Sequence, residues 1–162
     1  MTNKTPPGLG ELLRYVGELI DGGAEEDYRA MGLTYRPRYT PVLRALSAGA
    51  ETVTDITERS KLTQGAISQT VSLMQKDGLV ERRGLDDGRK SAIRLTRQGQ
   101  KLLATLEPHW NVTFEAIRAL EREIGRPLIE TLSDAAAALE RSGFHERLME
   151  ARTKSPSRKR KS

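Results

Sequence analysis

The 162-residue sequence contains no cysteine and only two histidines, His109 and His145. The absence of cysteine excludes disulfides, a thiol nucleophile, a cysteine-based zinc site and a switch driven by thiol oxidation. The two histidines stand far apart and lack the spacing of metal ligands. The sequence also has no phosphate-binding glycine loop and no nucleophile elbow. We therefore expect a protein that is not an enzyme and that has no metal site and no cofactor.

Long apolar runs are also missing, because no such run approaches the roughly 18 residues of a membrane span. The first seven residues lack the apolar core of a signal peptide, so we expect a cytoplasmic protein. Hydrophobic residues make up 36% and charged residues 30% of the chain, which is typical of a globular protein. We expect a disordered leader over 1–7, a single domain over 8–150 and a disordered basic tail over 151–162.

The net charge of +5 is distributed unevenly along the chain. Residues 59–101 contain 10 basic and 4 acidic side chains, and residues 151–162 contain 6 basic and none acidic. The flanking segments are acidic, with 3 basic and 6 acidic residues over 1–35 and 5 against 9 over 102–150. A basic central segment indicates a place where nucleic acid could bind. The tail is either a solubility feature or an arm that adds phosphate contacts.

The spacing of apolar residues predicts a helix from Leu9 to Ile20, which we expect Gly22-Gly23 to stop. Thr40 followed by Pro41 predicts the cap and first residue of a second helix, which ends near Gly49.

Two shorter helices are expected next, the first capped by Thr54 and the second running from a Thr63 cap to about Asp77, closed by Gly78. In residues 79–83 and 91–95 apolar and polar side chains then alternate, which predicts two strands joined by a turn. Thr96 is the expected cap of a long helix.

We expect this helix to be interrupted or kinked at Pro108, and a last helix to run from Pro127 to Gly143. The order of elements predicts a mainly α protein with a small β-wing. Its winged helix-turn-helix lobe covers about 40–97, with flanking helices over about 8–22 and 98–150.

The helix over 63–76 has an outward face suited to DNA. Ile67, Val71 and Met74 form its apolar stripe, so the opposite face is small and amide-bearing. A helix that enters the major groove needs such residues to approach closely and to bond base edges. Exposed serine, glutamine and glycine are equally typical of an ordinary solvated face, and the helix alone leaves both interpretations open. The candidate contacts are Thr63, Gln64, Gly65, Ser68, Gln69, Ser72 and Lys76.

The turn between the strands carries Asp87, Arg89 and Lys90 at or beside its tip. An arginine at the tip of a two-stranded ribbon can enter a minor groove, where the negative potential favours it. Asp87 is placed to orient Arg89 through a bidentate pair. Taken alone, this turn could also be a simple polar hairpin.

Three runs together resemble the MarR family of bacterial transcription regulators. They are Thr63 to Arg83, Asp87-Gly-Arg89, and Ile93-Arg-Leu-Thr-Arg-Gln-Gly99. The resemblance implies an obligate homodimer on double-stranded palindromic DNA, with the first and last helices in the interface. It further implies that 63–76 is the recognition helix, that Arg89 is the minor-groove arginine and that Asp87 orients it. The basic tail departs from many members.

Members of this family often bind small aromatic anions between the dimerisation helices and the DNA lobe. The resemblance therefore implies an aromatic or anionic effector, although each candidate is also an ordinary packing or surface residue. The candidates for this pocket are Tyr15, Tyr35, Arg38, Tyr39, His109 and Trp110.

The sequence thus predicts a cytoplasmic, nucleoid-associated homodimer that recognises a palindromic operator and represses transcription. Two alternatives stay open. One is an architectural protein that coats DNA without sequence preference, and the other is a winged-helix module that binds proteins.

Overall fold

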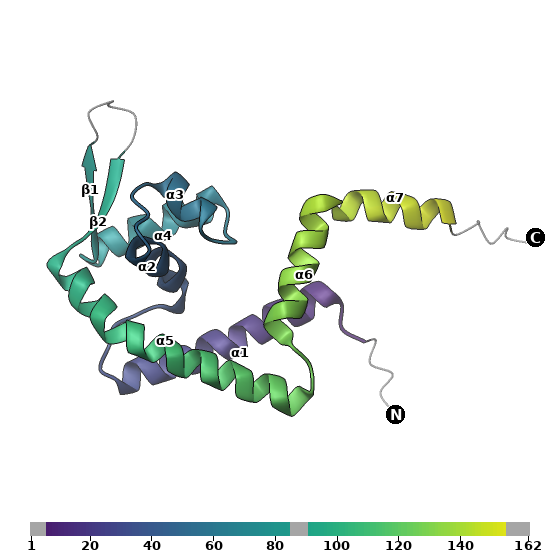
Figure 1. Ribbon diagram of the computed structural model, residues 1–162, viewed down its shortest axis with the longest axis horizontal. Coiled ribbons are helices and arrows are strands. Elements are labelled where there is room, and N and C mark those ends of the chain that lie inside the picture. The colour runs from purple at the N-terminus through teal and green to yellow at the C-terminus, as the bar shows by residue number, and fades with distance from the viewer. Residues whose placement is uncertain (1–5, 85–90, 155–162) are drawn as a thin grey trace, which may run out of the picture. The chain divides into compact units, whose positions relative to one another are not determined.

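The computed structural model describes residues 6–84 and 91–154. In this part the chain is mainly helical with one two-stranded sheet, so the expected fold class is confirmed (Figure 1). The chain divides into two compact units between Glu107 and Pro108. In chain order the elements are α1 (Leu9–Ala30), the 3₁₀ turn η1 (Pro37–Tyr39), α2 (Thr40–Ser47), α3 (Val53–Glu58), α4 (Gln64–Lys76), β1 (Val80–Gly84), β2 (Ser91–Leu95), α5 (Arg97–Ile124), α6 (Leu128–Arg141) and α7 (Phe144–Lys154).

The core of the first unit lies among α2, α3, α4 and the two strands. β1 and β2 pair antiparallel, with Val80 opposite Leu95 and Gly84 opposite Ser91. Burial of large apolar side chains is the main force that holds these short elements together. The side chains without solvent exposure include Val42, Leu43, Ile56, Ile67, Val71 and Met74.

Helix α1 is longer than the sequence predicted. It continues through Gly22 and Gly23 and ends only at Ala30, after which Met31 is the C-cap and Gly32 adopts a positive φ of 72°. A glycine inside a helix costs about 1 kcal/mol but does not stop it. The end of α1 is held by Tyr28, which is buried and packs edge-to-face on Tyr35.

Two helix starts also differ from expectation. Thr40 is the first residue of α2 and makes no cap bond, since its Oγ1 pairs with the hydroxyl of Tyr35 at 2.7 Å. Helix α3 is capped by Thr52, whereas the expected cap Thr54 lies inside the helix. The reason is Asp55, whose carboxylate completes a reciprocal capping box with Thr52.

The long helix α5 passes through Pro108 without interruption. Proline removes one backbone donor and strains the preceding turn, so it weakens the helix locally, but the residues on both sides of it stay helical. Helix α6 ends at Arg141, close to the expected Gly143, and α7 follows as a helix that the sequence did not predict. Because α7 reaches Lys154, the first four residues of the expected basic tail are helical, and the rest of that tail lies outside the described residues.

Over the residues described, none of the helices combines the length and the apolar character that crossing a bilayer would need.

Candidate nucleic-acid interface

Local signals fix both ends of α4. The Oγ1 of Thr63 accepts a hydrogen bond from the backbone N–H of Ala66 at 3.2 Å, which caps the first turn. At the other end Gly78 takes a positive φ of 72°, which suits a residue without a Cβ. Thr63 and Gly78 therefore bound this helix as the sequence predicted.

The rotation of α4 is fixed by its apolar stripe. Ile67, Val71 and Met74 have no solvent exposure, as their helical spacing predicted. Thr70 is also buried, and its hydroxyl donates to the carbonyl of Ala66 at 2.9 Å, so it leaves no unpaired donor in the core. Because this face is locked inward, the opposite face points to solvent.

The predicted recognition residues share that solvent face, with Thr63 at its N-terminal end. All are exposed except Ser68, which is half-buried. A Cβ at Gly65 would meet no atom within 4 Å, so the glycine leaves open space beside the first turn of the helix. No acidic residue occurs between Gln64 and Lys76. This face combines small size, amide groups and positive charge, which suits approach to a polyanion.

A surface depression of about 420 Å³ follows the C-terminal half of this face. Arg38 of η1 contributes to it, although the sequence had placed Arg38 among ligand-pocket candidates. The run Arg36-Pro37-Arg38 just before α2 was the signal that sequence reasoning did not use. The lining residues are Arg38, Ser68, Gln69, Ser72, Leu73 and Lys76.

Tyr39 fastens η1 to the end of α4. Its side chain is fully buried, and its hydroxyl donates to Oδ2 of Asp77 at 2.7 Å. Burial and the neighbouring carboxylate raise the pKa of Tyr39 to about 12. The ring also packs edge-to-face on Tyr35, with centroids 6.0 Å apart. Tyr35 and Tyr39 are therefore core residues of the first unit.

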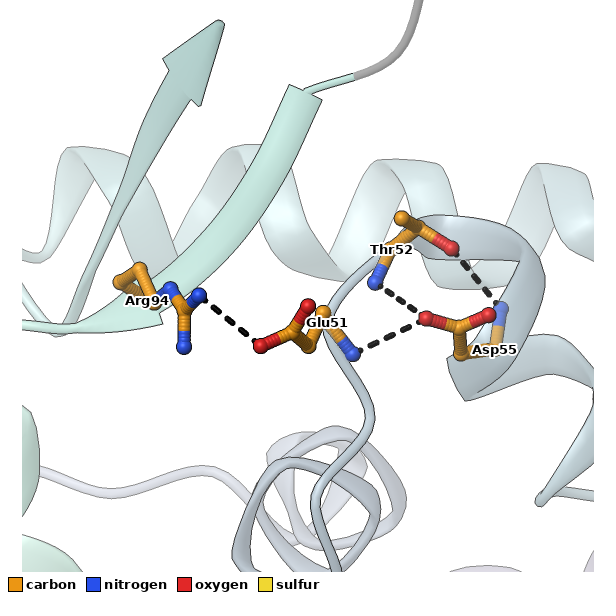
Figure 2. Close-up of polar contacts among 4 residues, drawn as sticks. All are labelled: Glu51, Thr52, Asp55 and Arg94. Atoms are coloured by element: carbon orange, nitrogen blue, oxygen red, sulfur yellow. Dashed lines mark hydrogen bonds and ion pairs between the residues drawn. The ribbon is translucent and has the colours of Figure 1, made fainter. Parts of the chain in front are cut away.

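The base of the wing is joined to the start of α3. Figure 2 shows Arg94 of β2 directed at Glu51, with Nη2 and Oε1 2.9 Å apart. The backbone N–H of Ile93 also donates to the carbonyl of Glu51 at 2.7 Å. The Asp55 carboxylate accepts from the N–H groups of Glu51 and Thr52, and these bonds hold the pKa of Asp55 below its usual value. The strand that carries the wing is thus tied to the helix-turn-helix.

The expected contacts at the wing tip, Asp87, Arg89 and Lys90, lie outside the described residues. They stay predictions of the sequence.

The remaining ligand-pocket candidates lie in separate environments. Tyr15 is exposed on α1 in the first unit, whereas Tyr35 and Tyr39 are in its core. His109 and Trp110 belong to α5 in the second unit. Among the described residues, the indole N–H of Trp110 is buried without a hydrogen-bond partner. Within the first unit, Tyr35 and Tyr39 pack on each other in the core, whereas Tyr15 and Arg38 are exposed.

Comparisons with known proteins agree with this geometry. Residues 31–91 match the model of the MarR family. No curated protein sequence matches the chain significantly.

Several solved structures share the fold. The Mycobacterium tuberculosis transcriptional regulator MOSR, in complex with DNA, superposes with a TM-score of 0.68 at 18% identity, over 85% of this chain and 100% of that chain. A MarR family transcriptional regulator from Silicibacter pomeroyi is 26% identical, with a TM-score of 0.53 over 81% of this chain and 88% of its own. The PcaV transcriptional regulator of Streptomyces coelicolor, with its natural ligand, is 25% identical, with a TM-score of 0.59 over 82% and 99% of the two chains.

Proposed function

The chain matches the MarR family over residues 31–91 and has the fold of that family's transcriptional regulators, and from this premise we propose that it is a sequence-specific DNA-binding regulator. The observation that carries the proposal is the outward face of α4, which is free of acidic residues and opposite a fully buried stripe. A major groove about 12 Å wide admits one helix, and glutamine can pair with both N6 and N7 of adenine. Gln64 and Gln69 are the residues of this face with that chemistry.

We propose that the regulator acts as a homodimer. Helix α1 exposes an apolar stripe whose six members are 37% to 73% accessible to solvent. Large exposed apolar patches of this kind mark protein interfaces. The second unit supports the same proposal, since Ile129, Leu132, Phe144 and Leu148 are exposed on α6 and α7. The stripe on α1 consists of Leu9, Leu12, Leu13, Val16, Leu19 and Ile20.

A twofold dimer presents two copies of α4 to one side of the DNA. The operator is therefore palindromic, with half-sites about one helical turn, roughly 10 bp, apart. The wing tip, with Arg89 oriented by Asp87, reaches the adjacent minor groove. Occupation of the operator represses transcription because it excludes other proteins from the same DNA.

An aromatic or anionic effector releases the DNA by changing the distance between the two recognition helices. The proposal has support from the PcaV structure, which contains that protein's natural ligand. A recognition-helix spacing that is identical with and without a bound effector would refute this mechanism.

The test begins with selection of DNA from a random-sequence library, followed by binding measurements on the selected site and on scrambled duplex. Gln69→Ala is expected to lower affinity for the selected site by about 1–3 kcal/mol and to relax its sequence preference, because a base contact is lost. Gln100→Ala, an exposed glutamine on α5, is the matched control and is expected to bind like the wild type. Arg89→Ala is expected to lose specific binding, whereas deletion of residues 155–162 is expected to preserve it.

Two other results would each identify a rival function. Affinity that disappears with the tail and shows no sequence preference identifies a protein that coats DNA. If the protein has no affinity for any duplex at low salt, it is instead a winged-helix module that binds proteins.

A further inference from the structure

One of the cations that line the depression along α4 does not come from α4 itself. Arg38 belongs to η1, whereas the other lining residues, including Lys76, belong to α4. Arg38 is exposed, and its neighbour Tyr39 is fully buried. The backbone that carries Arg38 is therefore anchored, while its side chain is left in solvent.

The anchor holds Arg38 beside the C-terminal end of the recognition helix. Tyr39 donates to Asp77, the residue that follows Lys76. Pro37 restricts the backbone on the other side of Arg38, since its ring fixes φ. A charged group in such a position loses less conformational freedom on binding than one on a free loop.

Arg38 and Lys76 have no competing partner in the part of the chain that the structure describes. The ion pairs found there, which include Arg83 with Glu81, Arg94 with Glu51 and Arg118 with Glu115, involve neither Arg38 nor Lys76. Both cations therefore remain available to an external anion.

The length of α4, compared with the width of the major groove, indicates which external anion Arg38 and Lys76 would bind. Ser68 and Lys76 are eight residues apart, which corresponds to about 12 Å along a helix. The major groove is also about 12 Å wide. When the Ser68 region of α4 faces the bases, the Lys76 end therefore lies at the edge of the groove, where the phosphates run.

We propose that Arg38 and Lys76 together bind one backbone phosphate at the edge of the major groove, so that η1 is part of the DNA interface. This inference rests on the proposed function and extends it to a segment outside the helix-turn-helix. The guanidinium of Arg38 presents paired donors that match two phosphate oxygens, and Lys76 adds a second positive charge. Such a contact positions the protein on DNA and carries no sequence information.

The test measures affinity across a salt titration on two short duplexes, one with the selected site and one with scrambled sequence. Loss of one phosphate contact lowers the slope of log affinity against log salt by about 0.9, which corresponds to about eightfold weaker binding at 0.1 M salt. Because Lys76 stays on the same phosphate, Arg38→Ala is expected to show part of this loss on both duplexes alike, and the double variant Arg38→Ala with Lys76→Ala is expected to show all of it. Arg38→Lys is expected to keep the slope, because it keeps the charge.

Arg36→Ala is the matched control. Arg36 precedes η1, is exposed and does not line the depression, so its removal tests the effect of charge alone. Equal losses in Arg36→Ala and Arg38→Ala would overturn the inference, as would a changed sequence preference in Arg38→Ala with an unchanged salt slope. If wild-type protein binds no duplex, the proposed function fails as well. If it binds and Arg38→Ala is unaltered in affinity and slope, this inference alone fails.

Discussion

Replacement of Gly99 by alanine is a direct test of how α5 joins the winged helix-turn-helix lobe. A Cβ at Gly99 would lie 2.0 Å from the carbonyl oxygen of Leu79 and 3.1 Å from Cδ2 of Leu95. The Leu79 carbonyl cannot yield easily, because it accepts the N–H of Thr96 at 3.0 Å and the Leu79 side chain is buried. The first turn of α5 must therefore shift by an ångström or more.

The expected cost follows from three contributions. Overpacking costs about 1–3 kcal/mol. Weakening of the bond between Thr96 and Leu79 adds about 1 kcal/mol. The better helix propensity of alanine offsets this loss of stability by up to about 1 kcal/mol. We expect Gly99→Ala to lower the free energy of unfolding by about 2 kcal/mol, and Tm by about 4–8 °C for a chain of this size.

Thermal unfolding followed by circular dichroism measures this change. Gly22→Ala is the control, because Gly22 lies within α1 and an added Cβ there meets no atom within 4 Å. Alanine at position 22 is expected to raise stability by up to about 1 kcal/mol. If Gly99→Ala is as stable as the wild type or more so, the close approach of α5 to Leu79 is not real.

Two further predictions concern α4 and its anchor. Gly65→Ala is expected to preserve or raise Tm, since its Cβ meets no protein atom and alanine is the better helix former, yet to weaken binding to the selected site by about tenfold, the scale of one lost base contact. Unchanged affinity in a binding titration would show that DNA does not approach this residue closely. The pKa of Tyr39 is near 10 in the unfolded chain and about 12 in the folded one. The protonated hydroxyl therefore contributes its full share of the unfolding free energy below pH 10, and this contribution is lost as the pH rises towards 12. Tyr39→Phe is therefore expected to lose less stability than the wild type between pH 10 and 12 in urea unfolding, and identical pH profiles would contradict this assignment.

The ends and the rotation of α4 were predictable because its signals are local. Three apolar residues at helical spacing fixed its rotation, and Thr63 and Gly78 marked its ends. Gly99 was part of the motif that suggested the family. The structure adds the physical reason, which is a backbone carbonyl too close to admit a Cβ.

The start of α3 could not be predicted from the periodicity of apolar residues. Thr52 and Thr54 are both plausible caps for α3, and the choice between them is made by Asp55. Its carboxylate binds the N–H groups of Glu51 and Thr52, so the helix starts after Thr52. The spacing of Thr52 and Asp55 was a readable signal, because an acidic residue three positions after a threonine can complete a capping box.

The assignment of Arg38 shows why a short segment resists prediction. Tyr35, Arg38 and Tyr39 were pocket candidates because the family resemblance implies an aromatic or anionic effector. In a 3₁₀ turn successive side chains are about 120° apart, so a buried Tyr39 turns Arg38 away from the core. The contact that buries the hydroxyl of Tyr39 comes from Asp77, 38 residues further along the chain. No window of local sequence contains both partners, so the place of Arg38 beside α4, on the surface that we expect to face DNA, becomes visible only with this tertiary contact.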